Sequence, residues 1–295
     1  MKILVTGSNG QLGREIRDLI SYYNKTDFIF KDLPDLDICD FSGLENFIIG
    51  NNINGVINCA AYNAVDKAEE NAEVAKKINS GGVSNLVNAL KTVNGKLIHI
   101  SSDYVFDGMH SQPYKESDPV NPIGVYGKTK RDGEISVINS SIDAIVIRTS
   151  WLYSYYGNNF VKTILDLGSS KEELRVVLDQ IGTPTYAKDL AKICLDILCA
   201  NSLREISENG RLYHYSNEGE ISWFDFAIAI IRLGKVNCKV LPVLSKDYST
   251  KVKRPYYSVL DKRKIKNDFN VEIPYWKDSL KDCILKIKKN KNCNS

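Results

Sequence analysis

The sequence predicts an α/β protein in which a doubly wound parallel sheet is joined to a smaller C-terminal lobe. Short apolar segments alternate with longer amphipathic segments through the first half of the chain. A glycine-rich turn follows the first apolar segment directly, and the regular alternation ends near Trp151. Strand, helix and strand at this spacing form right-handed crossover units, whose strands run parallel and are covered by helices on both faces. This is the Rossmann-like arrangement.

The individual elements follow from hydrophobic periodicity, taken in chain order. The expected strands of the first half are KILVT (2–6), DFIFK (27–31), GVINCA (55–60), KLIHIS (96–101) and AIVIRTS (144–150). The expected helices of the first half run over about 10–22, 41–51, 71–93 and 125–138. Later helices are expected at about 158–168, 186–200, 222–233 and 276–288, and short strands at 175–177, 211–215 and 238–243. We therefore expect a first domain over 1–150, onto which a later segment of about 177–215 packs, and a second lobe over 151–295.

Composition and charge exclude several classes of protein. The 295 residues are 43% hydrophobic and 25% charged with a net charge of +3, so neither nucleic acid nor an anionic membrane is indicated as a partner. No segment approaches the roughly 18 apolar residues of a membrane helix, and the N-terminus lacks a signal-peptide core. The seven cysteines and three histidines are scattered without metal-ligand spacing. We therefore expect a cytoplasmic protein without a zinc site or a disulfide framework.

The turn after the first strand carries glycines at every third position, as Gly7, Gly10 and Gly13. Gly7 permits a tight turn, Gly10 lets the backbone approach a pyrophosphate, and Gly13 lets the helix pack closely on the strand. The N–H groups of the helix start then face the phosphates. The first domain is thus expected to bind a dinucleotide and the second lobe mainly the substrate. Lys31 and Asp32 lie side by side at the end of the second strand. An acidic residue there favours the free ribose hydroxyl of NADH and a basic residue favours the phosphate of NADPH, so the choice between the two cofactors stays open.

Tyr126 and Lys130 lie four residues apart at the start of a predicted helix and therefore share one helical face. The nearby ammonium is expected to lower the pKa of the Tyr126 phenol from about 10 towards neutrality, so that the phenol can exchange a proton with a carbonyl oxygen. Ser102 follows the fourth strand at the edge where ligands bind. Its hydroxyl is placed to hydrogen-bond the same oxygen.

These elements, in this order on one α/β pattern, resemble the extended short-chain dehydrogenase/reductase family, and within it the reductases of dTDP-linked 4-keto-6-deoxysugars. The similar segments are NCAAYNAVDKAEEN (58–71), SSDYVFDG (101–108), VYGKTK (125–130), RTSWLY (148–153), NNFVKTIL (158–165), DQIGTPTYAKDLA (179–191) and RPYYSVLD (254–261). The resemblance implies an NAD(P)H-dependent oxidoreductase. Its expected reaction is reduction of the C4 keto group of dTDP-4-dehydro-6-deoxy-L-mannose to dTDP-L-rhamnose, a precursor of cell-surface polysaccharide.

The resemblance also assigns roles to residues. Tyr126 is expected to donate the proton, Lys130 to support it and bind the cofactor ribose, and Ser102, in place of the usual threonine, to orient the substrate oxygen. The expected substrate contacts are Ser102, Asp103, Trp151 and, at the nucleotide diphosphate, Arg254. The expected cofactor contacts are Gly7, Gly10, Gln11, Leu12, Gly13, Asp40, Phe41, Ala60, Ala61, Tyr62, Tyr126 and Lys130. The plainer alternatives are a capping carboxylate for Asp103, a core aromatic for Trp151 and a surface ion pair for Arg254.

Other readings of the same pattern remain open. A 4,6-dehydratase of this family has Asp-Glu after the central hydroxyl residue, whereas this chain has Asp103-Tyr104. A C4 epimerase retains its cofactor, which absorbance of the purified protein would reveal. A noncatalytic regulatory subunit, like that of methionine adenosyltransferase, is disfavoured because Ser102, Tyr126 and Lys130 are intact. A homodimer is possible, and magnesium, used by some relatives, has no evident ligand cluster. The C4 stereochemistry and the nucleotide base are left undetermined.

Overall fold

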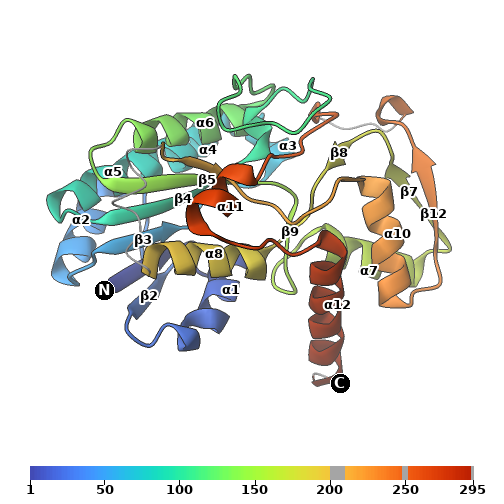
Figure 1. The fold of residues 1–295 in the computed structure, drawn as a ribbon, viewed down its shortest axis with the longest axis horizontal. Coiled ribbons are helices and arrows are strands. Elements are labelled where there is room, and N and C mark those ends of the chain that lie inside the picture. Colours follow the sequence, from blue (N-terminus) through green and yellow to red (C-terminus); the bar gives the residue numbers. More distant parts are fainter. Residues whose placement is uncertain (200–209, 248–251, 294–295) are drawn as a thin grey trace.

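The computed structural model describes residues 1–199, 210–247 and 252–293 of the chain. Its central element is a parallel six-stranded sheet in the order β10-β5-β4-β3-β1-β2 (Figure 1). The strands are β1 (Lys2–Thr6), β2 (Asp27–Lys31), β3 (Gly55–Asn58), β4 (Lys96–Ser102), β5 (Asp143–Thr149) and β10 (Leu212–His214). The chain leaves β1 for β2 on one side and then crosses to β3 on the other. Ligands bind at such a reversal, outside the carboxyl ends of the strands.

Helices cover both faces of this sheet. The helices α1 (Gln11–Leu19) and α8 (Ala187–Cys199) lie on one face, and α2 (Phe41–Gly50), α5 (Val83–Thr92) and α6 (Val125–Ile138) lie on the other. Ile16 of α1 packs in one core with Ile98 of β4, and Leu44 of α2 packs in the other with Val146 of β5. Burial of each such side chain contributes about 1.5–3 kcal/mol, so the two cores fix the sheet and the turns that follow its strands.

The helix predicted over 71–93 is confirmed as an unbroken helical run over 72–92, but its hydrogen-bond pattern changes in the middle. The run consists of α4 (Ala72–Lys76), a π-helical segment (Lys77–Gly82) and α5, and a separate short helix, α3 (Val65–Ala68), precedes it. The buried amide of Asn79 lies in the π-helical segment. It accepts a hydrogen bond from the Tyr62 backbone N–H at 2.8 Å and donates one to the Thr129 hydroxyl at 3.1 Å. Hydrophobic periodicity detects the helix but does not report a π turn formed around one buried polar side chain.

The second lobe has a hydrophobic core of its own and lies beyond the end of β5 (Figure 1). Its elements are β6 (Leu152–Tyr153), α7 (Phe160–Ser170), β7 (Glu173–Val177), β8 (Ile181–Gly182), β9 (Thr185–Tyr186), β11 (Ile221–Ser222), α10 (Trp223–Gly234), β12 (Lys239–Val243) and α12 (Trp276–Cys293). The strands form three small pairs, β7 with β12, β8 with β11 and β6 with β9. The two-residue strands were not predicted, because they are too short to show a period. Single 3₁₀ turns occupy Ile20–Tyr22, Asp103–Val105 and Ser245–Asp247.

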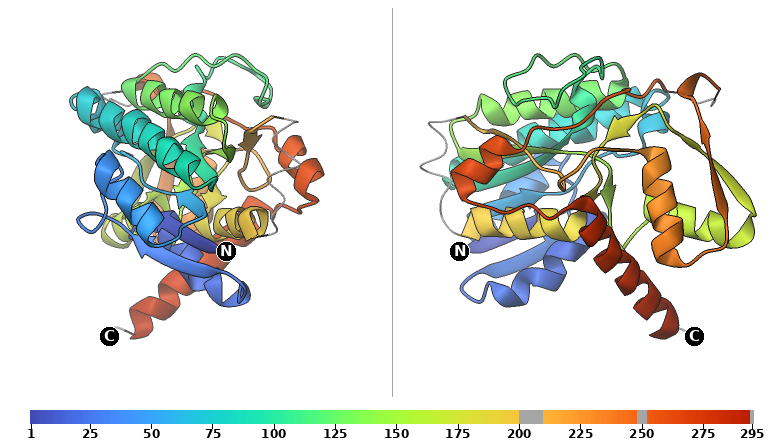
Figure 2. Two further views of the ribbon diagram at one scale, coloured as in Figure 1. Left: turned by 90° about the vertical axis from the view of Figure 1, so that its left-hand side faces the viewer. Right: turned by 45° about the vertical axis from the view of Figure 1, so that its right-hand side comes forward.

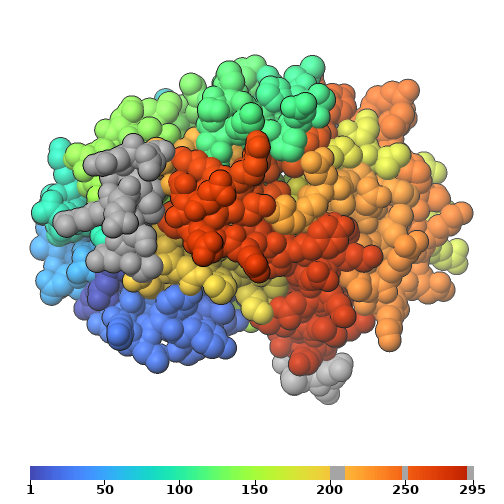
Figure 3. All heavy atoms as spheres, viewed as in Figure 1, coloured from blue at the N-terminus to red at the C-terminus, as the bar shows by residue number. Residues whose placement is uncertain are grey.

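Several later segments return to the first sheet (Figure 2). Helix α8 packs against α1, β10 pairs with β5 in parallel, and Ile265 of α11 (Arg263–Phe269) joins the core on the α1 side. In Figure 3 the red-orange segment around α11 lies between the green segment of the first half and yellow α8. Residues 200–209 of the segment expected to pack on the first domain lie outside the described residues. The division into two domains near 150 stays a prediction. No helix of the described ranges is both long enough and apolar enough to cross a membrane.

Candidate active site

A cavity of about 340 Å³ lies at the carboxyl ends of the central strands. Gly7 follows β1, Cys59 follows β3, Ser102 ends β4 and Thr149 ends β5, and all four line this cavity. Of the residues predicted from the sequence, the cavity brings together Gly7, Gly10, Gln11, Leu12, Ala61, Ser102, Asp103, Tyr126, Lys130 and Trp151. The glycine turn and the hydroxyl, phenol and ammonium groups, which lie up to 123 positions apart in the sequence, therefore meet at one place.

The glycine turn has the geometry that a phosphate site needs. Gly7 has a φ of +60°, and a Cβ there would lie 2.5 Å from the Ala60 backbone nitrogen. A Cβ on Gly13 would lie 2.6 Å from the Ser8 Cα, so α1 packs directly on the turn. Gly10 is the N-cap of α1 and provides no side-chain cap. The first N–H groups of α1 are therefore free of a side-chain cap and face the cavity, which fits the pyrophosphate of a dinucleotide.

The two charged residues at the end of β2 have different roles in the structure. Asp32 accepts hydrogen bonds from the backbone N–H groups of Asn9, at 2.8 Å, and Leu33, at 2.9 Å. Its carboxylate thus supports the glycine turn from outside. Lys31 forms an ion pair with Asp35 at 3.5 Å. Neither arrangement by itself decides between a ribose 2′-hydroxyl and a 2′-phosphate.

Helix α6 presents Tyr126 and Lys130 to the cavity, as the spacing predicted. Lys130 is buried, and its ammonium donates a hydrogen bond to the Ile100 carbonyl at 2.6 Å. The Tyr126 ring packs edge-on against Tyr104, with the ring centroids 5.5 Å apart. The Ser102 hydroxyl donates to Asp103 Oδ1 at 3.0 Å and accepts from the Tyr104 backbone N–H at 3.2 Å. These contacts fix the hydroxyl residue beside the phenol.

The expected effect of Lys130 on the phenol is wrong. Burial raises the pKa of Tyr126 well above its ordinary value, and a hydrogen bond with Ser102 opposes the rise only in part. Burial also lowers the pKa of Lys130, to about 8, against the attraction of Glu134. Loss of hydration is the largest cause of both pKa shifts, because both groups are packed against protein. A phenol with a raised pKa is protonated at neutral pH, and an alkoxide is basic enough to take its proton.

Asp103 and Trp151 both line the cavity, but each has other contacts. Asp103 is buried, and burial raises its pKa to about 6 although hydrogen bonds oppose the rise. Its Oδ2 has no hydrogen-bond partner within the described part of the chain. The Trp151 indole stacks on Trp223, with ring centroids 3.5 Å apart and planes at 12°. One face of Trp151 is therefore already covered, which leaves less of the indole for a sugar than we expected.

Some predicted contacts lie outside the cavity wall. Arg254 forms a half-exposed ion pair with Asp66 at 3.2 Å, as the plainer alternative predicted, and lines a second cavity of about 400 Å³. Asp40 caps α2 by accepting a hydrogen bond from the Gly43 N–H at 3.2 Å, and Phe41 is 37% exposed. The remaining predicted contacts that do not line the cavity are Gly13, Ala60 and Tyr62. Ala60 and Tyr62 belong to the loop after β3, which touches the glycine turn through Ala60.

This geometry can be compared with known proteins. The family model described as "RmlD substrate binding domain" matches residues 1–289. The chain belongs to the RmlD substrate binding domain family. The resemblance predicted from the sequence is thereby confirmed.

Individual members of the RmlD family are similar over almost the whole chain. The dTDP-4-dehydrorhamnose reductase of Aggregatibacter actinomycetemcomitans is 39% identical over 288 residues, covering 95% of this chain and 97% of that protein. The structure of the dTDP-4-dehydrorhamnose reductase of Clostridium acetobutylicum is 42% identical with a TM-score of 0.91, covering 98% of this chain and 100% of that one. The structure of the Bacillus anthracis enzyme, in complex with NADP, is 36% identical with a TM-score of 0.90, covering 97% and 99%. The predicted Rossmann-like fold class is confirmed.

Sequence reasoning missed several residues of this RmlD-family site. Tyr104 lines the cavity and touches Tyr126, and its place directly after Asp103 was the available signal. Glu134 was also not predicted as a site residue, although it follows Lys130 by one helical turn. It forms a buried two-pronged ion pair with Arg148 of β5, with distances of 2.8 and 2.7 Å. The pair joins α6 to the sheet and therefore holds the helix that carries the phenol and the ammonium.

The described residues of this RmlD-family chain contain no group of three or more His, Cys, Asp or Glu side chains that could hold a metal ion. No chemical step is assigned to magnesium.

Proposed function

We propose that the protein reduces the C4 keto group of dTDP-4-dehydro-6-deoxy-L-mannose with NADPH to give dTDP-L-rhamnose. Membership of the RmlD family and similarity to dTDP-4-dehydrorhamnose reductases over nearly the whole chain support this proposal. The observation on which this proposal depends most is that one cavity is lined by the glycine turn and by Ser102, Tyr126 and Lys130. Phosphate-binding and proton-donating groups at one cavity are what reduction of a carbonyl requires.

The glycine turn and the start of α1 would hold the pyrophosphate of the dinucleotide, and its reduced nicotinamide supplies a hydride when bound. Tyr126 donates its proton to the oxygen on C4 as the carbonyl becomes an alkoxide. Its raised pKa keeps the phenol protonated until that negative charge develops. Ser102 lies beside the phenol, where its hydroxyl orients the same oxygen.

Lys130 supports this step as a hydrogen-bond donor. An ammonium has three N–H groups, and only one is needed for the Ile100 carbonyl. The others are free to hold the ribose hydroxyls of the cofactor, so that the nicotinamide end lies beside Tyr126. With a pKa of about 8, Lys130 is mostly protonated at neutral pH and carries the charge that this role needs.

The substrate would extend from the cavity towards Arg254. Asp103 lines the cavity, and its carboxylate would accept a hydrogen bond from a sugar hydroxyl. The ion pair of Arg254 with Asp66 is half exposed, and such pairs contribute only about 0–1 kcal/mol. Arg254 can therefore leave Asp66 at little cost and bind a diphosphate. The second cavity, which Arg254 also lines, has an apolar wall that suits a nucleotide base.

NADPH is proposed over NADH because the Bacillus anthracis relative was determined in complex with NADP. The Asp32 carboxylate, which would otherwise accept a ribose 2′-hydroxyl, is already bonded to Asn9 and Leu33 backbone N–H groups. Cytoplasmic location and a homodimer stay predictions from the sequence.

The test is a coupled assay in which the 4-keto sugar nucleotide is generated enzymatically and offered with NADPH or with NADH. Loss of reduced-nicotinamide absorbance that depends on the sugar nucleotide supports the proposal, and NMR of the product identifies the C4 configuration. Absence of turnover with both cofactors would contradict the proposed function. A product with the opposite C4 configuration would change the named product but not the class of reaction.

A further inference from the structure

Trp151 has an unusual backbone conformation for so large a residue. Its φ is +46°, in the left-handed region that side chains with a bulky Cβ substituent rarely adopt. Such a conformation costs free energy and persists only where the surrounding structure enforces it. Trp151 directly follows Ser150 at the end of β5, and both residues line the catalytic cavity. The backbone strain therefore sets the direction of an indole at the place where the substrate is proposed to bind.

Two neighbours hold this indole. A Cβ added to Gly182 would lie 2.6 Å from ring atoms of Trp151, so only glycine leaves room for the indole on that side. Trp223 stacks on one face of it at 3.5 Å. Gly182 and Trp223 are linked to each other, because β8 and β11 pair Gly182 with Ile221, two residues before Trp223.

The backbone that carries Trp223 and Gly182 is itself well anchored. Ser222 and Asp225 form a reciprocal capping box at the start of α10, whose first residue is Trp223. The Ser150 hydroxyl donates to the Thr183 carbonyl at 2.6 Å, and the Thr183 hydroxyl donates to the Gly219 carbonyl at 2.7 Å. These bonds connect the strand end that carries Trp151 to the segment that leads to Trp223.

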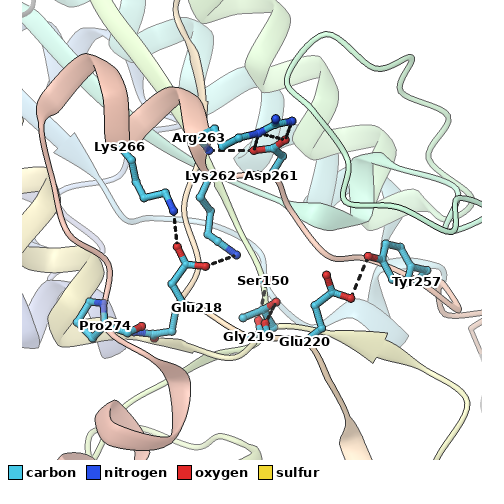
Figure 4. Close-up of polar contacts among 12 residues, drawn as sticks. Ser150, Glu218, Gly219, Glu220, Tyr257, Asp261, Lys262, Arg263, Lys266 and Pro274 are labelled. Carbon is cyan, nitrogen blue, oxygen red and sulfur yellow. Dashed lines mark hydrogen bonds and ion pairs between the residues drawn. The ribbon is translucent and has the colours of Figure 1, made fainter.

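Side chains next to Gly219 hold the same segment from the other side (Figure 4). Glu218 forms ion pairs with Lys262 at 3.5 Å and Lys266 at 2.7 Å. The Tyr257 hydroxyl donates to Glu220 at 3.2 Å. The position of Trp223 is therefore fixed by contacts that lie outside the catalytic cavity.

The two stacked indoles line different cavities. Trp151 lines the catalytic cavity, and Trp223 lines the second cavity together with Phe160 and Arg254. The proposed substrate has a sugar at one end and a nucleotide at the other. If it occupies both cavities, it contacts the lining of each, to which Trp151 and Trp223 belong.

We propose that Trp223 is a positioning residue that holds Trp151 against the sugar and forms, with it, the wall between the sugar and nucleotide subsites. This inference rests on the proposed function, because it assumes a substrate that reaches both cavities. Trp223 does not touch the reacting atoms, and its contribution is to substrate affinity. Loss of its ring weakens binding of ground state and transition state alike, which raises KM and spares kcat.

The experiment compares Trp223→Ala and Trp223→Phe with Phe224→Leu, a matched change at the next residue of α10. Trp223→Ala is expected to raise the KM for the keto sugar nucleotide about tenfold, the upper end of what one aromatic pair contributes, with kcat within about threefold. Trp223→Phe restores most of the affinity, and Phe224→Leu leaves it unchanged. Because stacked indoles couple their transitions, the far-ultraviolet circular dichroism of the wild type carries paired bands that both Trp223 variants lose.

A second variant tests the wall without altering Trp223. Gly182→Ala places a methyl group against the Trp151 indole and is expected to raise the same KM. It keeps the test valid if Trp223→Ala does not fold. Unchanged KM in both Trp223→Ala and Gly182→Ala, or a fall in kcat alone, would overturn the proposal.

Failure of the proposed function is distinguishable from failure of this inference. If the wild type does not turn over the keto sugar nucleotide, the proposed function fails. Binding of dTDP, followed through tryptophan fluorescence, then tests the wall on its own. Weaker dTDP binding to Trp223→Ala than to Phe224→Leu supports the role of Trp223, and equal binding refutes it.

Discussion

Replacement of Tyr126 by phenylalanine tests the proton donor with little structural disturbance. The variant removes one oxygen and keeps the ring that packs edge-on against Tyr104. The lost hydrogen bond with Ser102 is worth about 1 kcal/mol net, and the Ser102 hydroxyl keeps Asp103 as a partner at 3.0 Å. Stability should therefore change little. Loss of a general acid is expected to lower kcat by roughly 10²–10⁴-fold, or about 3–5 kcal/mol of activation free energy.

The assay follows oxidation of NADPH at saturating keto sugar nucleotide, with cofactor affinity measured separately by fluorescence. Tyr104→Phe is the matched control, because it removes the neighbouring phenol oxygen from the same cavity. We expect the control to retain most of its kcat and both variants to bind NADPH as the wild type does. The assignment of Tyr126 as proton donor is refuted if Tyr126→Phe keeps more than about a tenth of the wild-type kcat, or if Tyr104→Phe lowers kcat more than Tyr126→Phe does.

Three further predictions follow from the same structure. The kcat/KM of the wild type should fall as pH rises through about 8, where Lys130 loses its charge, and a pH–rate profile flat to pH 10 would contradict the role of that ammonium. Burial raises the pKa of Glu15 from 4.5 to about 7. The stability that protonated Glu15 contributes is therefore fully present below pH 4.5 and is lost as pH rises through about 7, which lowers the free energy of unfolding by about 3 kcal/mol. In thermal denaturation, the stability of Glu15→Gln relative to the wild type should therefore be greater at pH 8 than at pH 5. If the difference in stability between the variant and the wild type is the same at both pH values, Glu15 is not the group involved. Gly7→Ala should destabilise the protein by at least about 2 kcal/mol in urea titrations and abolish cofactor binding, because of its φ of +60° and the contact with Ala60. Gly50→Ala, where no atom lies within 4 Å, serves as its control.

The parts of the fold that the sequence predicted are those with a strong hydrophobic period. Helix α6 runs over Val125–Ile138 as expected, and β1 and β2 have the predicted bounds. The expected helix over 71–93 is present over 72–92, but the sequence did not predict the π-helical segment in its middle, where the buried amide of Asn79 lies. The segment expected to pack onto the first domain includes β10, but the sequence did not predict that β10 pairs with β5, which it follows by more than 60 residues.

The chemistry of the site was predicted less fully than its residues. Spacing placed Tyr126 and Lys130 on one face of a helix, but spacing does not report hydration, and burial raised the phenol pKa instead of lowering it. The stack of Trp151 on Trp223 joins residues 72 positions apart and leaves no pattern in the sequence. Arg254 was assigned by resemblance alone, and its ion pair with Asp66 is again a contact between distant segments.

The path of the chain limits how the cleft between the two cores can open. The chain leaves the sheet after β5, returns as α8, supplies β10 to the sheet edge, leaves again to form α10, and comes back as α11 before it ends in α12. A hinge motion needs loop residues that can change conformation freely, whereas several of these crossings, within the described residues, begin or end at a strand pair or a packed helix. Swinging the lobes apart would disturb several of these at once. Substrate entry and cofactor exchange at each turnover should therefore depend on local movements of side chains and loops at the rim.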